Sequence, residues 1–298
     1  MGSGNIASGN YSTAMGFESI ASGVNSFSIG YGTNSEGNAT TGTPYYRNEA
    51  LGERSFVIGG RNKATGIKSF TLGNDNLAQG IGSSSIGENN ISTGDYSMSL
   101  GLFSESVAKQ SFAFGNNAYA DGYNTTAIGS ANTIDDNATP DQWDQNNRAL
   151  VVGNGFYDES AAQLTRSDAF TVWFNGDATL AGNLNINSDA RLKANIISLG
   201  STLAKLLQID GKTYTMKKDE SEKQKIGLLA QDLEKVFPEL VSESKGIKSV
   251  NYQGLVPVLI NAIKDQDVLM KEQEKILSEQ KSELDKLKAL VHDLIEKQ

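Results

Sequence analysis

The stretch SFTLGNDNLAQGIGSSSIGENNISTGDYSMSLG, residues 69–101, decides how the first half of this chain folds. Glycine returns in it at every seventh residue, and small side chains alternate before the glycine, as in Ser69-x-Thr71-x-Gly73. Alternation with a period of two is typical of a β-strand. A helical heptad is excluded, because each Gly costs about 1 kcal/mol in a helix. The pattern therefore predicts short strands, each followed by a Gly in a turn that needs positive φ.

The seven-residue spacing extends to both sides of this stretch. It runs through Gly2, Gly9, Gly16, Gly23, Gly30 and Gly37, and after one extra residue it resumes with Gly52, Gly59 and Gly66. Ala108 replaces one glycine, and Gly115, Gly122 and Gly129 follow. We expect the change of phase, around residues 43–47, to be a loop that bulges from one coil.

A second period of 14 residues lies over the first. The residue before Gly is apolar at every second glycine: Met15, Ile29, Ile58, Leu72, Ile86, Leu100, Phe114 and Ile128. Between them it is mostly polar: Ser22, Glu36, Thr65, Gln79, Thr93 and Asp121. The repeat is therefore a 14-residue coil of two short strands, which stacked neighbours must complete. The apolar row up one side predicts self-association around a long axis.

In this pattern, residues 2–135 resemble the head repeats of trimeric autotransporter adhesins. The resemblance implies a left-handed β-roll that assembles as a trimer. We assign residues 1–135 to this part. Residues 136–187 look like the β-rich neck that precedes a self-cleaving chaperone in phage fibres, with strands at 148–155 and 169–177 that end in Asn-Gly turns and an alternating strand at 179–186.

Composition limits what else the chain can do. It has 298 residues, no Cys, one His and a formal net charge of −9. We predict no metal site and no cofactor, since neither thiolates nor a His cluster exists. The acidic balance argues against nucleic acid, and no apolar run approaches the roughly 20 residues that span a bilayer. The repeat is already running at the first residues, so we expect a fragment that lacks an N-terminal part.

Four separated motifs in the last third resemble one family. They are Ser188-Asp189-x-Arg191-x-Lys193-x-Asn195-Ile196, Gly227-Leu228-x-Ala230-Gln231-Asp232, Phe237-Pro238-Glu239-Leu240-Val241 and Val250-x-Tyr252. The family is the intramolecular chaperone auto-processing domain, a Ser-Lys peptidase at the C-terminus of phage tail spikes and fibres. The match spans about 187–265, and we assign 188–265 to this α+β domain. One departure is Asn251, where members often carry Asp. The residue pattern itself predicts helix at 201–207, a strand at Tyr214, a strand leading into a short helix that Pro238 ends, and a long helix from Leu255.

The resemblance implies a trimeric domain that guides fibre assembly and then cuts itself off. Carried onto this chain, the nucleophile is Ser188, the base is Lys193, and the bond cut lies between Ser188 and Asp189. Arg191 and Asn195 are candidate supporting residues. By spacing alone, Ser188 and Lys193 would be an ordinary surface turn with a solvated Lys.

The chemistry sets a condition on Lys193. A Lys removes the proton of a Ser hydroxyl only as the neutral amine, and an exposed Lys holds its proton at neutral pH. Burial in an assembled trimer is expected to lower that pKa. Attack by Ser188 on its own carbonyl would need a strained ring. Attack from a neighbouring subunit and an acyl shift at the preceding bond are both open.

The tail, residues 266–298, is predicted to be a coiled coil. Apolar residues recur every seventh position at Val256, Ile263, Met270, Leu277, Leu284 and Val291. Three residues after each of these stand Leu259, Gln266, Gln273, Gln280, Leu287 and Leu294. This is the heptad of a coiled coil, in which the three Gln weaken the seam and fix register and stoichiometry. We predict a trimer.

Together these features predict the distal part of a homotrimeric phage tail fibre in the virion tail. Its partners are copies of itself and a host cell-surface receptor, for which a glycan is one candidate. Enzymatic activity, if present, is a single self-cleavage without external substrates. The alternative is a bacterial trimeric surface adhesin, on the cell surface, that carries a non-cleaving chaperone domain. The polar helix that ends the chain argues against it, because such adhesins end in membrane strands. A polysaccharide-degrading spike is a third class, but no carboxylate pair stands out.

Overall fold

The computed structural model describes residues 2–32, 47–217 and 222–296, and the chain divides into two compact units. Unit 1 is Met1–Ile186 and unit 2 is Asn187–Gln298. Glu36, Gly37 and most of the loop predicted around 43–47 lie outside the described residues.

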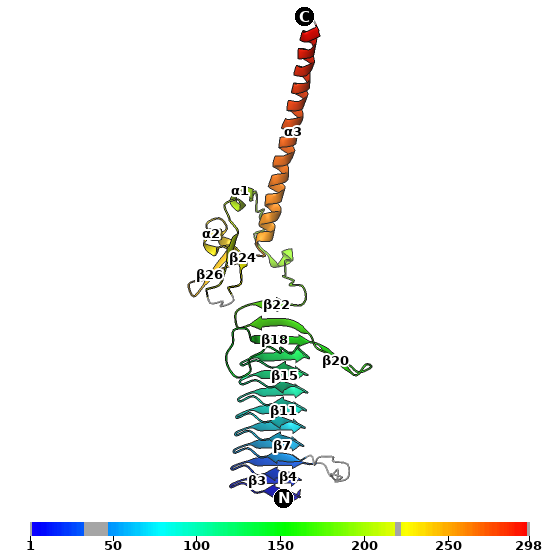
Figure 1. The fold of residues 1–298 in the computed structure, drawn as a ribbon, viewed down its shortest axis with the longest axis vertical. Coiled ribbons are helices and arrows are strands. Elements are labelled where there is room, and N and C mark those ends of the chain that lie inside the picture. The colour runs from blue at the N-terminus through cyan, green and yellow to red at the C-terminus, as the bar shows by residue number, and fades with distance from the viewer. Residues whose placement is uncertain (1, 33–46, 218–221, 297–298) are drawn as a thin grey trace. The chain divides into compact units, whose positions relative to one another are not determined.

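Two parallel sheets build a solenoid in unit 1, and Figure 1 shows their strands stacked as successive rungs. Sheet A begins with β1 (Gly2–Ser3), β3 (Thr13–Phe17), β5 (Phe27–Tyr31), β7 (Phe56–Gly60), β9 (Phe70–Asn74), β11 (Ser84–Glu88), β13 (Met98–Leu102), β15 (Phe112–Asn116) and β17 (Thr126–Ser130). Sheet B contains β2 (Ile6–Ala7), β4 (Ser19–Ala21), β6 (Asn48–Ala50), β8 (Lys63–Ala64), β10 (Leu77–Ala78), β12 (Ile91–Ser92), β14 (Glu105–Ser106) and β16 (Tyr119–Ala120).

The strand register confirms the 14-residue coil. Gly73 pairs with Gly87 and Gly87 with Gly101, so each coil places one strand in each sheet. Gly30 pairs directly with Gly59, 29 positions further along, so one coil carries the insertion that shifts the phase. The predicted mainly β solenoid half is therefore confirmed.

The interior of the solenoid is filled by small side chains, many of them polar. Its fully buried residues include Ser85, Ser99, Ala113 and Ala127, which alternate with outward-facing apolar side chains along the sheet A strands. A ladder of buried asparagines repeats with the coil at Asn48, Asn62, Asn76 and Asn90. Each amide bonds to the next coil; for example, Asn76 Nδ2 donates to the Gly87 carbonyl at 2.8 Å, and Asn76 Oδ1 accepts from the Asn90 amide at 3.1 Å. These bonds satisfy polar groups that burial would otherwise penalise.

The glycines form two sets, and the prediction of a turn glycine after each strand holds for only one of them. One set lies inside the sheet A strands with positive φ: in Gly87 φ is 115°, and a Cβ there would come within 2.1 Å of the Gly101 carbonyl oxygen. The other set follows the sheet B strands and opens the turns, as predicted, but without positive φ. A Cβ on Gly80 would lie 2.0 Å from the Gly94 carbonyl oxygen. Close approach of stacked backbones therefore requires both sets.

Sheet A continues past the last regular coil. β18 (Arg148–Asn154) pairs in parallel with β17, and β21 (Asp168–Trp173) and β22 (Ala178–Leu180) then add antiparallel strands. The prediction of a strand over 179–186 is wrong beyond Leu180: the Ala181 amide still donates to the Ala169 carbonyl, and residues 182–186 are exposed and form no strand. A separate hairpin, β19 (Phe156–Asp158) and β20 (Gln163–Thr165), projects from this end of unit 1 (Figure 1).

A buried ionic cluster lies where the parallel coils give way to antiparallel strands. Arg148 Nη2 donates to Asp121 Oδ2 at 2.6 Å, and the two side chains are 4% and 8% exposed. Arg148 also bonds to the Thr133 carbonyl and lies 3.6 Å from Asp168. Thr133 in turn donates from its amide and hydroxyl to Asp168. The cluster joins the last coil to the strands beyond it.

Unit 2 is α+β and ends in a long helix. Its elements are η1 (Ala190–Leu192), α1 (Leu203–Leu206), β23 (Lys212–Tyr214), β24 (Lys225–Gly227), α2 (Ala230–Glu234), η2 (Pro238–Leu240), β25 (Val241–Ser244), β26 (Ile247–Val250) and α3 (Leu255–Glu296). Pro238 begins η2 instead of ending α2, which stops at Glu234. Leu233, Phe237 and Leu240 form the core with Leu255 and Val258 at the start of α3.

The start of α3 also holds α1 in place. Asp265 Oδ2 accepts from the amides of Thr202 and Leu203 at 2.8 and 3.0 Å and from the Ser201 hydroxyl at 2.8 Å. These bonds, led by the one from Leu203, lower the pKa of the Asp265 carboxyl. The side chain therefore caps the N-terminus of α1 from another helix.

Candidate functional site

Ser188 and Lys193 lie in contact, although five residues separate them in sequence. Lys193 Nζ donates a hydrogen bond to Ser188 Oγ at 2.7 Å. That distance is within the range in which a base can take a hydroxyl proton. The predicted nucleophile and base are thus placed together.

A short turn joins the two residues. Asp189 is the N-cap of η1, and its Oδ1 accepts from the Arg191 amide at 2.9 Å. The Lys193 amide donates to the Ala190 carbonyl at 3.1 Å and closes the turn. Ser188, which precedes the cap, and Lys193, which follows the turn, therefore face each other.

Arg191 also binds Asp189 through its guanidinium. Nε lies 3.1 Å from each carboxylate oxygen and Nη2 lies 2.6 Å from Oδ2. These side-chain bonds, with the Arg191 amide second, lower the pKa of the Asp189 carboxyl. The same pairing raises the pKa of Arg191. Asn195 follows in left-handed backbone, with φ at 54°, a conformation that Asn adopts more readily than most residues.

All of these residues are exposed in the single chain. Asn187, Ser188, Asp189, Arg191 and Leu192 line an open depression on the surface. The pair therefore has the contact that the chemistry needs but lies open to water.

Two of the other family-like motifs meet inside unit 2. Tyr252 Oη accepts from the Leu228 amide at 2.9 Å, and a Cβ on Gly227 would lie 2.6 Å from the same oxygen. The glycine therefore makes room for the tyrosine hydroxyl. Asn251 Oδ1 accepts from the Gly254 amide at 3.1 Å, a bond that an Asp could make equally well.

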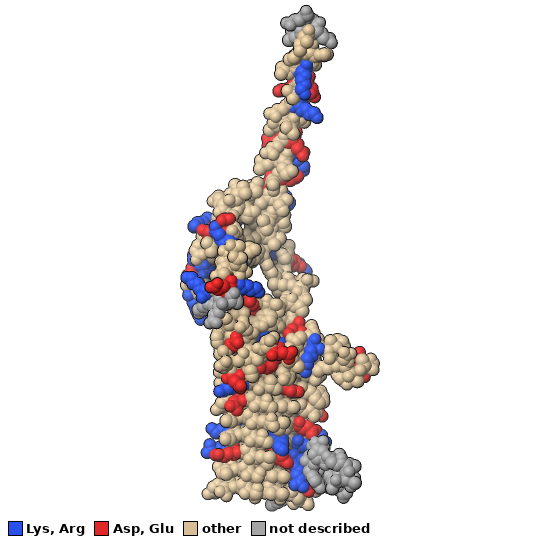
Figure 2. Space-filling view, in the orientation of Figure 1, with Lys and Arg blue, Asp and Glu red and all other residues tan. Residues whose placement is uncertain are grey.

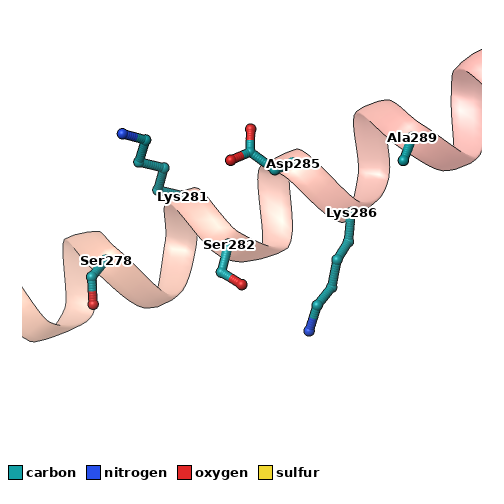
Figure 3. Close-up of a pocket in the computed structure, with 6 residues that line it drawn as sticks. All are labelled: Ser278, Lys281, Ser282, Asp285, Lys286 and Ala289. Carbon is teal, nitrogen blue, oxygen red and sulfur yellow. The ribbon is translucent and has the colours of Figure 1, made fainter.

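Both units leave apolar surface uncovered. On sheet A the predicted apolar row is exposed or half-buried, with Met15, Leu72 and Leu100 near 40% exposed. Uncharged side chains cover most of the face of unit 1 seen in Figure 2. On α3 the first heptad position is 49–67% exposed from Val256 to Val291. Figure 3 shows residues of α3 outside this seam, namely Ser278, Lys281, Ser282, Asp285, Lys286 and Ala289, most of which are polar.

Other kinds of site find no support in the part of the chain that the structure describes. There, no three His, Asp or Glu side chains gather as they would around a metal ion. Within the same residues, no helix combines the length and apolar character needed to cross a membrane.

Comparison with known families divides the chain in the same way. Residues 188–242 match the family described as chaperone of endosialidase. Residues 1–41, 78–104 and 107–132 match the YadA head domain repeat.

Two curated relatives are long tail fiber proteins named Gp37. The chain is 30% identical over 188 residues to that of Salmonella phage S16, covering 56% of this chain and 24% of the relative. It is 26% identical over 132 residues to that of Escherichia phage AR1, covering 41% and 11%. The chain thus spans about a quarter or less of their length.

These matches support a phage tail fibre with a chaperone domain. They favour the fibre over a surface adhesin and fit a place in the virion tail. In the chaperone domain, Ser188 and Lys193 lie at the start of the matched region.

Proposed function

We propose that this chain is the distal part of a homotrimeric tail fibre that attaches to a host cell-surface receptor. Its chaperone domain directs trimer assembly and then releases itself by cutting between Ser188 and Asp189. The observation that carries the proposal is the 2.7 Å hydrogen bond between Lys193 Nζ and Ser188 Oγ. Residues 1–135 form the shaft or receptor-binding part, 136–187 the neck, 188–265 the chaperone and 266–298 a coiled coil.

Three copies would cover the apolar surface that one chain leaves open. The outward row on sheet A runs the length of the solenoid, so matching rows of other copies can pack along it. The exposed heptad seam of α3 likewise needs partner helices. In each surface the apolar side chains recur at a regular spacing, as expected where identical copies pack around an axis.

The cleavage chemistry needs Lys193 as a neutral amine. Its nitrogen takes the Ser188 hydroxyl proton while Oγ attacks a peptide carbonyl, and the proton then passes to the leaving amine. Water hydrolyses the resulting ester, which frees the serine. At neutral pH only about one exposed Lys in 2,500 is unprotonated. Packing of subunits around the exposed motif removes water and lowers the Lys193 pKa, so that correct assembly switches on the cut.

Two routes satisfy this chemistry and give different products. Attack by Ser188 of a neighbouring subunit on the carbonyl of Ser188 yields a fragment of residues 189–298. An acyl shift from Asn187 to Oγ, followed by hydrolysis, yields residues 188–298. The proposed bond corresponds to the first product.

Intact-mass spectrometry of the purified full chain tests the proposal. We expect a fragment of residues 189–298, and its loss in Ser188→Ala and in Lys193→Gln. Ser198→Ala, a change at a second exposed serine of the same segment, should leave cleavage intact. A wild-type chain that stays whole after long incubation at high pH would refute self-cleavage. Sedimentation of Ser188→Ala as a monomer would refute the trimer.

A further inference from the structure

We infer that Asp189 and Arg191 act together as a positioning clamp that holds Ser188 against Lys193. This inference rests on the proposed self-cleavage and assigns a role to the two charged residues between nucleophile and base. Neither residue is given a part in proton transfer.

The clamp consists of several bonds within three residues. Asp189 Oδ1 accepts from the Arg191 amide and from Nε, and Oδ2 accepts from Nε and Nη2. One carboxylate thus fixes both the backbone and the side chain of Arg191. A planar guanidinium suits this arrangement, because it presents its donors in a rigid fork.

Two backbone hydrogen bonds hold the turn, from the Leu192 amide to the Asp189 carbonyl and from the Lys193 amide to the Ala190 carbonyl. η1 has only three residues, and none of them is buried in the single chain. A single helical turn of this length is weak in water. The side-chain bonds of Asp189 add to the two backbone bonds and help to hold Lys193 near Ser188. Sequence spacing gives no sign of this.

The same bonds disfavour a proton-transfer role. The Asp189 carboxylate is occupied by three donor groups of Arg191, which lower its pKa and keep it ionised. A general base works best with a pKa near the working pH. Arg191 keeps its proton in any case. Positioning is the role left to both.

The clamp also links the cleavage rate to the residue after the cut. Asp189 supplies the leaving amine, and its side chain shapes the turn that presents the serine before that bond. We expect the domain to require Asp at this position because Arg191 holds it, in addition to any contact from another subunit.

A double-mutant cycle on the full chain tests the clamp. The rate of appearance of the 189–298 fragment is measured against pH for wild type, Asp189→Asn, Arg191→Lys and the double variant. We expect each single change to slow cleavage about tenfold or more, since small misplacements of reacting groups are costly. The double variant should be no slower than the slower single one, and the pH midpoint of the charge-conserving Arg191→Lys should stay at the wild-type value. Arg191→Lys keeps the positive charge. Sedimentation of each variant shows whether it still assembles, so that a slower cut is not mistaken for a loss of folding.

A matched control is the exposed pair Asp267 and Lys271 on α3, joined at 2.7 Å. Asp267→Asn and Lys271→Gln should leave the cleavage rate unchanged. Wild-type rates in the clamp variants, or fully additive losses, would overturn the clamp while leaving self-cleavage standing. A shifted pH midpoint in Arg191→Lys, which keeps the charge, would contradict a purely positioning role for the pair. An uncut wild type would overturn the proposed function and the clamp with it.

Discussion

The solenoid coils and the Ser188–Lys193 segment show opposite ways of satisfying polar groups. In the coils, buried amides such as Asn76 and Asn90 bond to the next coil of the same chain. Around Ser188, every side chain is exposed and the hydrogen bonds stay within a few residues. Each coil is buried by the neighbouring coils of its own chain. The Ser188–Lys193 segment is not buried by any part of its own chain that the structure describes.

The two regions therefore differ in what stabilises them. The stability of the solenoid is a sum of contributions from each coil and from its contacts with adjacent coils. The Ser188–Lys193 pair is formed but exposed, so the proposed cleavage would depend on assembly. Substitutions in both units test this contrast.

Gly101→Ala should disrupt the solenoid outright. A Cβ there would lie 2.0 Å from the Gly115 carbonyl oxygen, and φ is 126°. We expect a loss of more than about 5 kcal/mol in the free energy of unfolding. Both tryptophans, Trp143 and Trp173, lie in unit 1, so their fluorescence in urea reports on this unit.

The reverse change in the turn set is Ala108→Gly, at the one natural alanine in the glycine series. It should cost about 1–2 kcal/mol, through chain entropy and the loss of one buried methyl group. Wild-type stability of Gly101→Ala would contradict the close stacking of coils.

Arg148→Ala should be the next most damaging change. It leaves Asp121, 8% exposed, as a buried carboxylate without its cation, which costs about 3–5 kcal/mol. Urea unfolding followed by tryptophan fluorescence measures the loss. Arg54→Ala, which removes an exposed ion pair with Glu53 in the same unit, should change stability by about 0.5 kcal/mol or less. Equal effects of the two variants would show that burial of the cluster is unimportant.

Gln273→Leu should sharpen the contrast by closing the α3 seam more tightly. Burying an apolar side chain in place of Gln stabilises the assembled helices by about 2 kcal/mol per chain. The same change removes a polar core residue that favours one stoichiometry, so a wider range of oligomers is expected. Thermal unfolding by circular dichroism and sedimentation report the two effects. A destabilised variant would place residue 273 outside the seam.

Asp265→Asn should give the smallest effect, one that depends on pH. The folded-state pKa of Asp265 is lowered by bonds from Leu203, Ser201 and Thr202, so its stabilisation is present above the unfolded pKa. It is lost as pH falls through the folded value, below about pH 4. The variant should therefore be less stable than wild type at neutral pH and equal to it in acid. Asp267→Asn, whose carboxylate binds only an exposed lysine, should not show this convergence.

Much of the solenoid follows from sequence because its rule is local and repeated. Alternation and the 14-residue period give the strands, but side-chain pattern does not reveal how closely backbones stack, which is what Gly80 and Gly87 reflect. The period also stops before β18, so the continuation of sheet A was missed, as was the buried Arg148 cluster. A lone Arg among strand residues gives no sign of burial. The prediction of a strand over 179–186 was wrong after Leu180, because alternating side chains do not by themselves provide a neighbouring strand to pair with.

The site was predictable only through its likeness to a family. Ser188 and Lys193 carry no signal by spacing, and the turn that joins them depends on one cap and one guanidinium. The bond from Asp265 to α1 spans more than 60 positions and has no local pattern at all. Contacts of this kind depend on the tertiary structure and cannot be predicted from the local sequence.

The hydrogen bond between Ser188 and Lys193 crosses the bond that is proposed to break. By the proposed cut, the hydroxyl would stay at the end of the fibre and the amine would leave with the chaperone. Each fragment would then carry half of the Ser188–Lys193 pair. The fibre would have no base beside its terminal serine, so it could neither repeat the reaction nor reverse it.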